Sequence, residues 1–410
     1  MLHGSLHPDF APVGVSLSRI LPRRGPGGAS VCVYHRGEKV VDIWGGTRDA
    51  AGNPWQEDTL SVSFSTTKGV ASTLLHVFAD RGHIDYDARV ADYWPEFAQN
   101  GKEAITVRHL LCHEAGLYAI SDLVEDASEM LDWEQMVRRL AAAKPRHAPG
   151  TAHGYHALTY GWLVGELVQR VAGKPICELL ASELAGPLGL DGLFCGVAAD
   201  QQHRCAQLFA RGFGDPIEKR RANTEQMIAR AQRWKRRLAS VGMRWDPTEA
   251  LAALLPPGME QLDFDSETFR AASILAANGM FTARSLARLY ACLANGGELD
   301  GVRLLSAEAV KRATTEQNRG VGRVIPLSMR WRLGYHRAFA IGARSHGFGH
   351  YGFGGSGAFA DPKRQLAVAL TVNSGVGSPL GDLRIARIGG VALRCADRRA
   401  TRALPALASA

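Results

Sequence analysis

Hydrophobic residues near the start of the chain fall into two short β-type runs. The runs cover residues 29–35 and 39–44, and Arg36, Gly37 and Glu38 separate them. β-Branched and aromatic residues favour strands, and a glycine between two such runs supplies a turn. The pattern therefore predicts an antiparallel hairpin near the N-terminus.

Helical periodicity takes over in the middle of the chain. Residues 68–79 are so densely apolar that they predict a helix buried in the core. A capped helix is expected over residues 106–112. Further helices are predicted over residues 132–192, where proline and glycine separate them, and over residues 273–293, with a break near Asn278.

The C-terminal part returns to strand-like runs over residues 333–341, 356–360 and 365–372, and a closing helix is predicted over residues 380–394. Strands at both chain ends with helices between them predict an α+β fold. In this fold an antiparallel sheet is built from both ends of the chain and is flanked by helices.

Composition places the chain among ordinary globular proteins, with 46% apolar and 21% charged residues in 410. No stretch approaches the roughly 20 apolar residues of a membrane helix, and the first residues do not resemble a secretory signal. We therefore expect a cytoplasmic protein. The seven cysteines are scattered without a C-x-x-C pair, so neither a disulfide framework nor a cysteine-based zinc site is expected.

The formal net charge of +8 raises the question of a nucleic-acid partner. Much of the excess lies in a basic insertion at about residues 215–262 with helical spacing, and no nucleic-acid-binding motif accompanies it. We interpret it as the solvated face of an inserted helix, with docking to an acidic partner or a membrane as the alternative. We predict no nucleic-acid partner.

The candidate chemistry begins with Ser65-Thr66-Thr67-Lys68. Serine and lysine three residues apart at the start of a helix share one face, and a neutral lysine amine can accept the serine proton. S-x-x-K is the nucleophile motif of β-lactamases and penicillin-binding proteins. On its own the motif is equally typical of an N-capped helix with an exposed lysine.

The surrounding stretches decide between these interpretations. The chain resembles the serine β-lactamase and penicillin-binding-protein superfamily, and within it the class C β-lactamase-like (family VIII) carboxylesterases. Five segments in the same order carry the resemblance: residues 65–69, 106–117, 149–161, 277–284 and 349–356. The resemblance implies a β-lactamase/transpeptidase-like fold. It implies one catalytic domain, with a sheet subdomain from residues 1–64 and 325–410 and a mainly helical subdomain from residues 65–324.

The resemblance also assigns roles to residues far from Ser65. Tyr155 takes the place of the family's catalytic tyrosine, and its phenol pKa is expected to be lowered by the amine of Lys68. The lactamases usually have asparagine where this chain has Ala157, and we predict that His156 partly substitutes for it in substrate binding.

A third element, His350-Tyr351-Gly352, matches the Lys-Thr-Gly strand of the lactamases with histidine in place of lysine. The resemblance makes all three substrate-binding residues and assigns the oxyanion hole to the backbone N–H groups of Ser65 and Phe353. A histidine with a reference pKa of about 6.5 is mostly neutral at pH 7 and recognises a substrate carboxylate poorly.

Other polar patterns carry less weight. His109 and His113 have a spacing that can bind metal, but no third ligand is apparent, so structural roles are predicted. Residues 14–18 fall short of G-x-S-x-G because Ser18 replaces the closing glycine. Trp331 and Tyr335 are candidates for a cleft wall or for the core.

The sequence as a whole predicts a cofactor-independent serine carboxylesterase that cleaves short-chain esters through an acyl-enzyme on Ser65, with Lys68 and Tyr155 as the acid–base pair. Its only expected partner is the small-molecule ester. Two alternatives stay open: a β-lactamase, D-aminopeptidase or transesterase activity at the same site, and a non-catalytic homologue that binds a partner or forms filaments.

Overall fold

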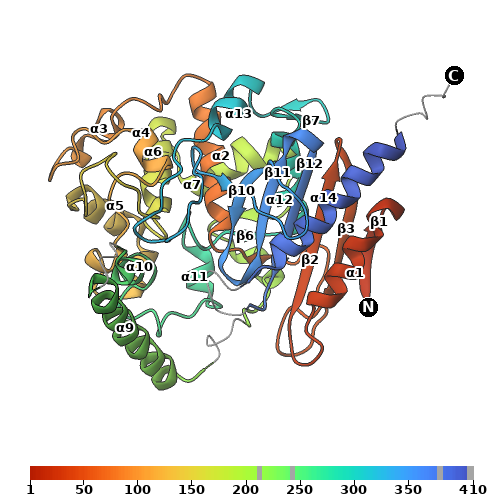
Figure 1. Cartoon of the computed structure of the whole chain (residues 1–410), viewed down its shortest axis with the longest axis horizontal. Helices are drawn as coiled ribbons and strands as arrows, with labels where there is room; N and C mark the ends of the chain where they lie inside the picture. The colour runs from red at the N-terminus through yellow and green to blue at the C-terminus, as the bar shows by residue number, and fades with distance from the viewer. Residues whose placement is uncertain (210–214, 241–244, 376–381, 404–410) are drawn as a thin grey trace.

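A seven-stranded antiparallel sheet forms one half of the molecule (Figure 1). The computed structural model describes residues 1–209, 215–240, 245–375 and 382–403. The strand order is β1-β3-β2-β12-β11-β10-β9. The bounds are β1 (Leu2–Leu6), β2 (Gly28–His35), β3 (Glu38–Gly46), β9 (His336–Arg337), β10 (Phe348–Tyr351), β11 (Gly357–Asp361) and β12 (Leu366–Val372). Strands from both chain ends therefore share one sheet, which confirms the predicted α+β class.

The N-terminal hairpin forms as predicted. Strands β2 and β3 pair with Val31 opposite Ile43, and the turn between them has positive φ angles at Arg36 and Gly37. Two left-handed residues in a row match the right-handed twist of the flanking strands. Every residue of β2 is buried, because helices cover both faces of the sheet.

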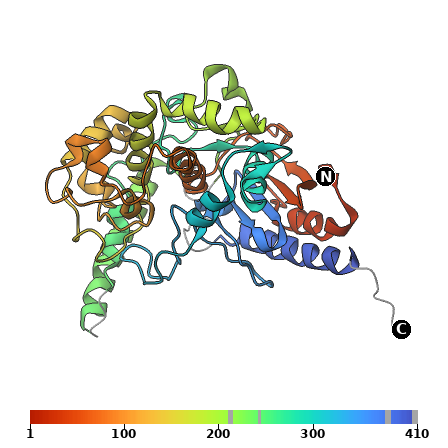
Figure 2. The ribbon, with the colours of Figure 1, turned by 90° about the horizontal axis from the view of Figure 1, so that it is seen from above.

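Helices α1 (Ala11–Ile20) and α14 (Arg384–Ala403) pack together on one face of the sheet (Figures 1 and 2). The other face contacts α12 (Ala283–Ala294), and α2 (Thr66–Asp80) packs against β10. Fourteen of the fifteen residues of α2 are buried. This central position fixes the start of α2 between the sheet and the remaining helices.

The helical half surrounds α2 on the side away from the hairpin (Figure 1). Its longer helices are α5 (Trp133–Ala142), α6 (Tyr160–Ala172), α9 (Ile217–Ser240), α10 (Pro247–Leu254) and α13 (Ala307–Thr314). Shorter ones are α3 (Val90–Tyr93), α4 (Val107–Leu111), α7 (Ile176–Leu179), α8 (Gly186–Leu188) and α11 (Glu267–Ala271). Two small sheets, β4-β6-β5 (Ser61–Val62, Met280–Phe281, Leu193–Phe194) and β7-β8 (Glu298–Leu299, Val302–Arg303), complete the fold.

The basic insertion forms α9 and α10. Helix α9 extends away from the rest of the molecule in both views, and only Ala231 and Leu238 along it are buried (Figures 1 and 2). Helix α10 lies closer in, where Ala253 joins a buried cluster with Tyr155 and Trp331. The insertion therefore reaches the neighbourhood of the predicted site through α10.

Two predicted elements are shorter than expected. Of the predicted helical range 273–293, only residues 283–293 are helical. Before the predicted break, the Asn278 amide binds backbone groups at Phe269 and Ile274 and folds the segment into a loop. In the predicted strand over residues 333–341, only His336–Arg337 pairs, after a left-handed Gly334. Helix α14 begins at Arg384, and residues 380–381 of its predicted range lie outside the described residues.

Candidate active site

Ser65 lies immediately before the first residue of α2, as predicted. The residue before it, Phe64, has a φ of 45°, a left-handed conformation that costs a non-glycine residue about 1–2 kcal/mol. The side chain of Thr67 holds this turn, since its hydroxyl donates to Phe64 O at 2.6 Å and accepts the Gly279 N–H at 3.0 Å. The strained turn brings the Ser65 hydroxyl to the start of the helix, where the helix dipole favours negative charge.

Three side chains meet at the Ser65 hydroxyl. Lys68 Nζ lies 3.1 Å from Ser65 Oγ, and the Tyr155 hydroxyl donates to the same oxygen at 2.7 Å. Lys68 comes from one turn along α2, whereas Tyr155 comes from the loop between α5 and α6. Both distances are short enough for direct proton transfer.

Lys68 is completely buried and lies beside carbonyl groups instead of a counter-ion. Its amine donates to the carbonyl oxygens of Ala157 at 2.6 Å and Ala276 at 2.9 Å. No carboxylate of the described residues lies within 4.0 Å of the amine. Burial therefore lowers its pKa well below the ordinary lysine value. A neutral amine has two N–H groups for the two carbonyls and one lone pair, which is left for the serine proton.

Tyr155 is held by ring contacts. Its ring stacks on Trp331 with centroids 5.6 Å apart and planes 9° apart, and Lys68 Nζ lies 4.9 Å from the ring centroid. Burial raises the pKa of Tyr155, so the expectation that the amine lowers it is wrong. The phenol therefore keeps its proton at neutral pH and is a donor to oxygen.

His113 positions the loop that carries Tyr155. Its carbonyl accepts the Gly154 N–H at 2.9 Å, and its Nδ1 accepts the His156 N–H at 3.2 Å. These two bonds bracket Tyr155 on both sides. The sequence predicted a structural histidine at position 113, but gave no sign that it anchors the tyrosine.

His156 has a different place from the one predicted. Its ring is fully buried, stacks on His113 and accepts the Leu117 N–H on Nε2 at 3.1 Å. Burial also lowers its pKa to about 3, so the ring is neutral. These contacts give His156 a structural role instead of the predicted substrate contact.

The segment that follows strand β10 borders the Ser65 turn. A Cβ on Gly352 would lie 2.2 Å from Ser63 O, so only glycine allows the strand to approach the nucleophile turn this closely. His336 on β9 supports the strand by accepting the Tyr351 N–H at 3.0 Å. The Phe353 ring packs on Phe64 with centroids 5.3 Å apart, which brings the segment after β10 beside the Ser65 turn.

His350 is buried next to the same group of side chains. Its ring lies 6.1 Å from the Tyr155 ring and 4.9 Å from that of His336. Burial, with His336 and Lys68 nearby, lowers the pKa of His350 well below its ordinary value. The position that is lysine in the lactamases therefore carries no positive charge here.

The described ranges contain no group of three or more His, Cys, Asp and Glu side chains arranged to hold a metal ion. His109 caps α4 by accepting the Thr106 N–H at 3.2 Å, and His113 orients Tyr155. Within the same ranges, every helix falls short of the length and apolarity needed to cross a bilayer.

A helix-start serine in contact with a buried lysine and a tyrosine, beside an antiparallel sheet, is the arrangement of the S-x-x-K serine hydrolases. The Beta-lactamase family model matches residues 19–392. The chain belongs to the β-lactamase family and is a serine hydrolase.

Known proteins agree with this assignment. The chain is 40% identical to "Esterase/beta-lactamase LipL" of Mycobacterium tuberculosis over 373 residues, covering 90% of this chain and 82% of that protein. Among solved structures it is similar to a family VIII carboxylesterase, with 34% identity, a TM-score of 0.82, and 96% of this chain and 100% of that chain covered. A penicillin-binding-protein homologue from Caulobacter crescentus matches with 34% identity and a TM-score of 0.81, over 96% and 100% of the two chains. The predicted family and fold are confirmed.

Proposed function

We propose that this serine hydrolase is a carboxylesterase that cleaves short-chain esters through an acyl-enzyme on Ser65. The observation that carries the proposal is that the Ser65 hydroxyl contacts both the Lys68 amine and the Tyr155 phenol. The amine is buried and has no carboxylate beside it among the described residues. The similarity to the solved structure of a family VIII carboxylesterase supports an ester as the substrate class.

In the first half-reaction the neutral Lys68 amine takes the Ser65 proton, and Oγ forms a bond to the ester carbonyl carbon. The Tyr155 hydroxyl gives its proton to the alkoxide oxygen as the ester C–O bond breaks, and the proton on Lys68 restores the phenol. The alcohol leaves with the proton that came from Tyr155, and the proton that began on Ser65 ends on the phenol. Because burial keeps the phenol protonated, Tyr155 acts as the acid and relay, and Lys68 alone acts as the resting base.

In the second half-reaction, water takes the place of the alcohol. The neutral Lys68 amine takes one of its protons, with Tyr155 as the relay, as the water oxygen attacks the acyl carbon. The bond to Ser65 Oγ then breaks, and that oxygen recovers a proton, so the products are a carboxylic acid and the free enzyme.

We assign the oxyanion hole to the backbone N–H groups of Ser65 and Phe353. The first N–H groups of a helix have no intrahelical acceptor and point beyond its N-terminus, where Ser65 stands. Phe353 follows Gly352 at the point where the strand segment meets the Ser65 turn. Removing one such donor typically costs about 10²–10³ in rate.

Two residues favour esters over β-lactams. Ala157 offers a methyl where an amide would bind an acylamino group, and it is only 3% exposed. His350 is buried and neutral, so it presents no cation to a substrate carboxylate. Neither feature hinders attack on a simple ester.

A β-lactamase activity is the second candidate, because the 40% identical relative is named an esterase/beta-lactamase. Hydrolysis of p-nitrophenyl butyrate and of nitrocefin by the same preparation separates the two, and we expect the ester to be much the better substrate. A ratio that favours nitrocefin would replace the esterase with a lactamase.

A fluorophosphonate probe tests the nucleophile and the non-catalytic alternative together. We expect the label on Ser65, and we expect Ser65→Ala to abolish both labelling and ester hydrolysis. Ser16→Ala is the matched control, because Ser16 lies in the near-miss G-x-S-x-S segment and should not affect either readout. Ester hydrolysis by Ser65→Ala within tenfold of the parent rate would end the proposal.

A further inference from the structure

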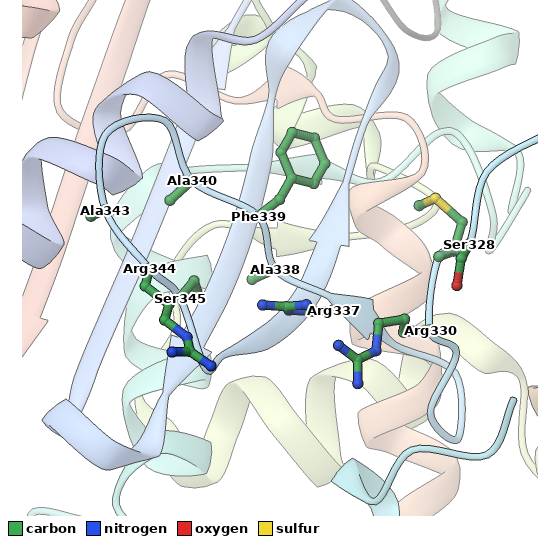
Figure 3. Close-up of a pocket in the computed structure, with 10 residues that line it drawn as sticks. Ser328, Arg330, Arg337, Ala338, Phe339, Ala340, Ala343, Arg344 and Ser345 are labelled. Atoms are coloured by element: carbon green, nitrogen blue, oxygen red, sulfur yellow. The ribbon is translucent and has the colours of Figure 1, made fainter. Parts of the chain in front are cut away.

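A second concave site lies along the outer edge of the sheet, beside β9. A pocket of about 270 Å³ is lined by residues 328–330, 337–340 and 343–345 (Figure 3). A second pocket of about 220 Å³ shares four of these lining residues, namely Arg330, Arg337, Arg344 and Ser345. None of these residues belongs to the proposed catalytic machinery.

The site is rich in arginine and poor in carboxylate. Arg330, Arg332, Arg337 and Arg344 line the two pockets, and Glu316 is the single acidic residue among the lining side chains. Glu316 already contacts two arginines, Arg330 at 2.6 Å and Arg319. In the described part of the chain, no carboxylate lies within 4.0 Å of the Arg337 or Arg344 guanidinium. The site therefore has a local excess of positive charge.

Holding these arginines close together costs free energy. Arg330 has a φ of 53°, in the left-handed region that non-glycine residues avoid. Arg332 is anchored by donating from Nε to Thr314 O at 2.7 Å, and burial together with Arg330 and Arg337 lowers its pKa. Like charges gathered at a concave surface repel one another, so the empty pocket is destabilised and an anion would relieve the repulsion.

We propose that this pocket binds a small anion whose phosphate or carboxylate group is held by the guanidinium groups of Arg337, Arg344 and Arg330. Guanidinium forks match the planar or tetrahedral oxygens of these groups and bind them bidentately. Figure 3 shows the side chains of Arg337, Arg344 and Arg330 in the same part of the view, and Phe339 and three alanines are also among the residues that line the pocket. The apolar wall suits an organic anion with a short hydrocarbon or aromatic part better than inorganic phosphate.

The pocket and the candidate active site share one segment of the chain. Trp331 lies between Arg330 and Arg332, and its ring stacks on Tyr155. The segment of residues 330–332 therefore contributes both to this pocket and to the surroundings of Tyr155. Anion binding at this pocket is independent of which ester or lactam the enzyme cleaves.

Thermal unfolding and isothermal titration calorimetry test the proposal with three probes: inorganic phosphate, phenyl phosphate and benzoate. Each probe is measured at matched ionic strength, with sodium chloride as the reference. Binding to the folded state raises the unfolding temperature by mass action. We expect phenyl phosphate to bind at least tenfold more tightly than inorganic phosphate. Comparison with benzoate shows whether phosphate or carboxylate is the preferred group.

The Arg337→Gln/Arg344→Gln double variant is expected to weaken phenyl phosphate binding at least tenfold, while its unfolding temperature without ligand stays equal to or above that of the parent. Arg398→Gln, which removes an exposed arginine on α14, is the matched control and should bind like the parent. Equal binding by the double variant, or a shift that chloride reproduces, would show an adventitious ion only and would overturn the proposal.

Discussion

The protonation state of Lys68 can be measured through stability. An amine whose pKa is lowered in the folded state has released its proton there, while the unfolded chain still binds one up to its ordinary pKa of about 10.4. The unfolded state therefore carries one more proton than the folded state over this window. The free energy of unfolding must rise with pH by about 1.4 kcal/mol per pH unit from this group alone.

Lys68→Met removes this dependence while keeping an apolar stem of similar length in the buried site. Between pH 7 and pH 9, the difference in unfolding free energy between the parent and Lys68→Met should rise by about 2.7 kcal/mol in favour of the parent. Only the slope is used, because losing the bonds to the Ala157 and Ala276 carbonyls changes stability by an amount that does not vary with pH. Urea titrations followed by circular dichroism at several pH values provide the measurement.

Lys102 is the matched control for this experiment. It is also a buried lysine that donates to a backbone carbonyl, Gln99 O at 2.8 Å, and burial lowers its pKa to about 8. Lys102→Met should therefore produce only about half the change over the same range, about 1.4 kcal/mol, most of it above pH 8. If the curves of the parent and Lys68→Met are parallel, Lys68 is charged in the folded enzyme and cannot be the resting base.

Three further changes probe the neighbours of Ser65. Tyr155→Phe keeps the ring that stacks on Trp331 but removes the proton donor. The kcat for p-nitrophenyl butyrate should therefore fall by about 10²–10⁴-fold, with an unchanged unfolding temperature. A loss of kcat below threefold would exclude Tyr155 from the mechanism. His113→Ala leaves the His156 N–H without its acceptor, at about 1–3 kcal/mol, and should lower kcat more than it changes KM. His109→Ala removes only the cap of α4 and should lower stability alone, so equal kcat losses in the two variants would contradict the positioning role. Ala157→Asp brings a carboxylate to the surroundings of Lys68 and should raise the pKa of the amine, which moves the acidic limb of the kcat/KM profile to higher pH. Ala157→Asn is the neutral control. Identical pH profiles for the two variants would argue against titration of Lys68.

The sequence was informative where function depends on residue type at a fixed local spacing. Ser65 and Lys68 are one turn apart, so their contact follows from helix geometry once α2 exists. The hairpin and the strand over residues 366–372 could also be predicted from the sequence, because a glycine turn and a continuous apolar run each have few other interpretations.

Other features depend on contacts between distant segments, and no local pattern reports them. The Lys68 amine is held by the backbone carbonyls of Ala157 and Ala276. Any residue type has such a carbonyl, so the residue types at these positions do not predict the contact. The direction of the His156 ring was likewise undetermined, since a histidine next to Tyr155 can face the nucleophile or the interior. The 273–293 segment was predicted to be helical with a break near Asn278, because its apolar residues have helical spacing. The part before the break forms a loop, since the buried amide of Asn278 binds the backbone there.

The site depends as much on what Lys68 lacks as on what it touches. A buried ammonium is normally stabilised by a carboxylate, and that partner would keep the amine protonated and useless as a base. Two carbonyls satisfy the N–H groups without adding charge, and complete burial then disfavours the ammonium. The neutral His350 and the protonated Tyr155 follow from the same cause, because a dry pocket favours the uncharged form of every group in it. Desolvation around helix α2 thus sets the protonation of Lys68, Tyr155 and His350 together, which is why the proposed base and acid need no counter-ion.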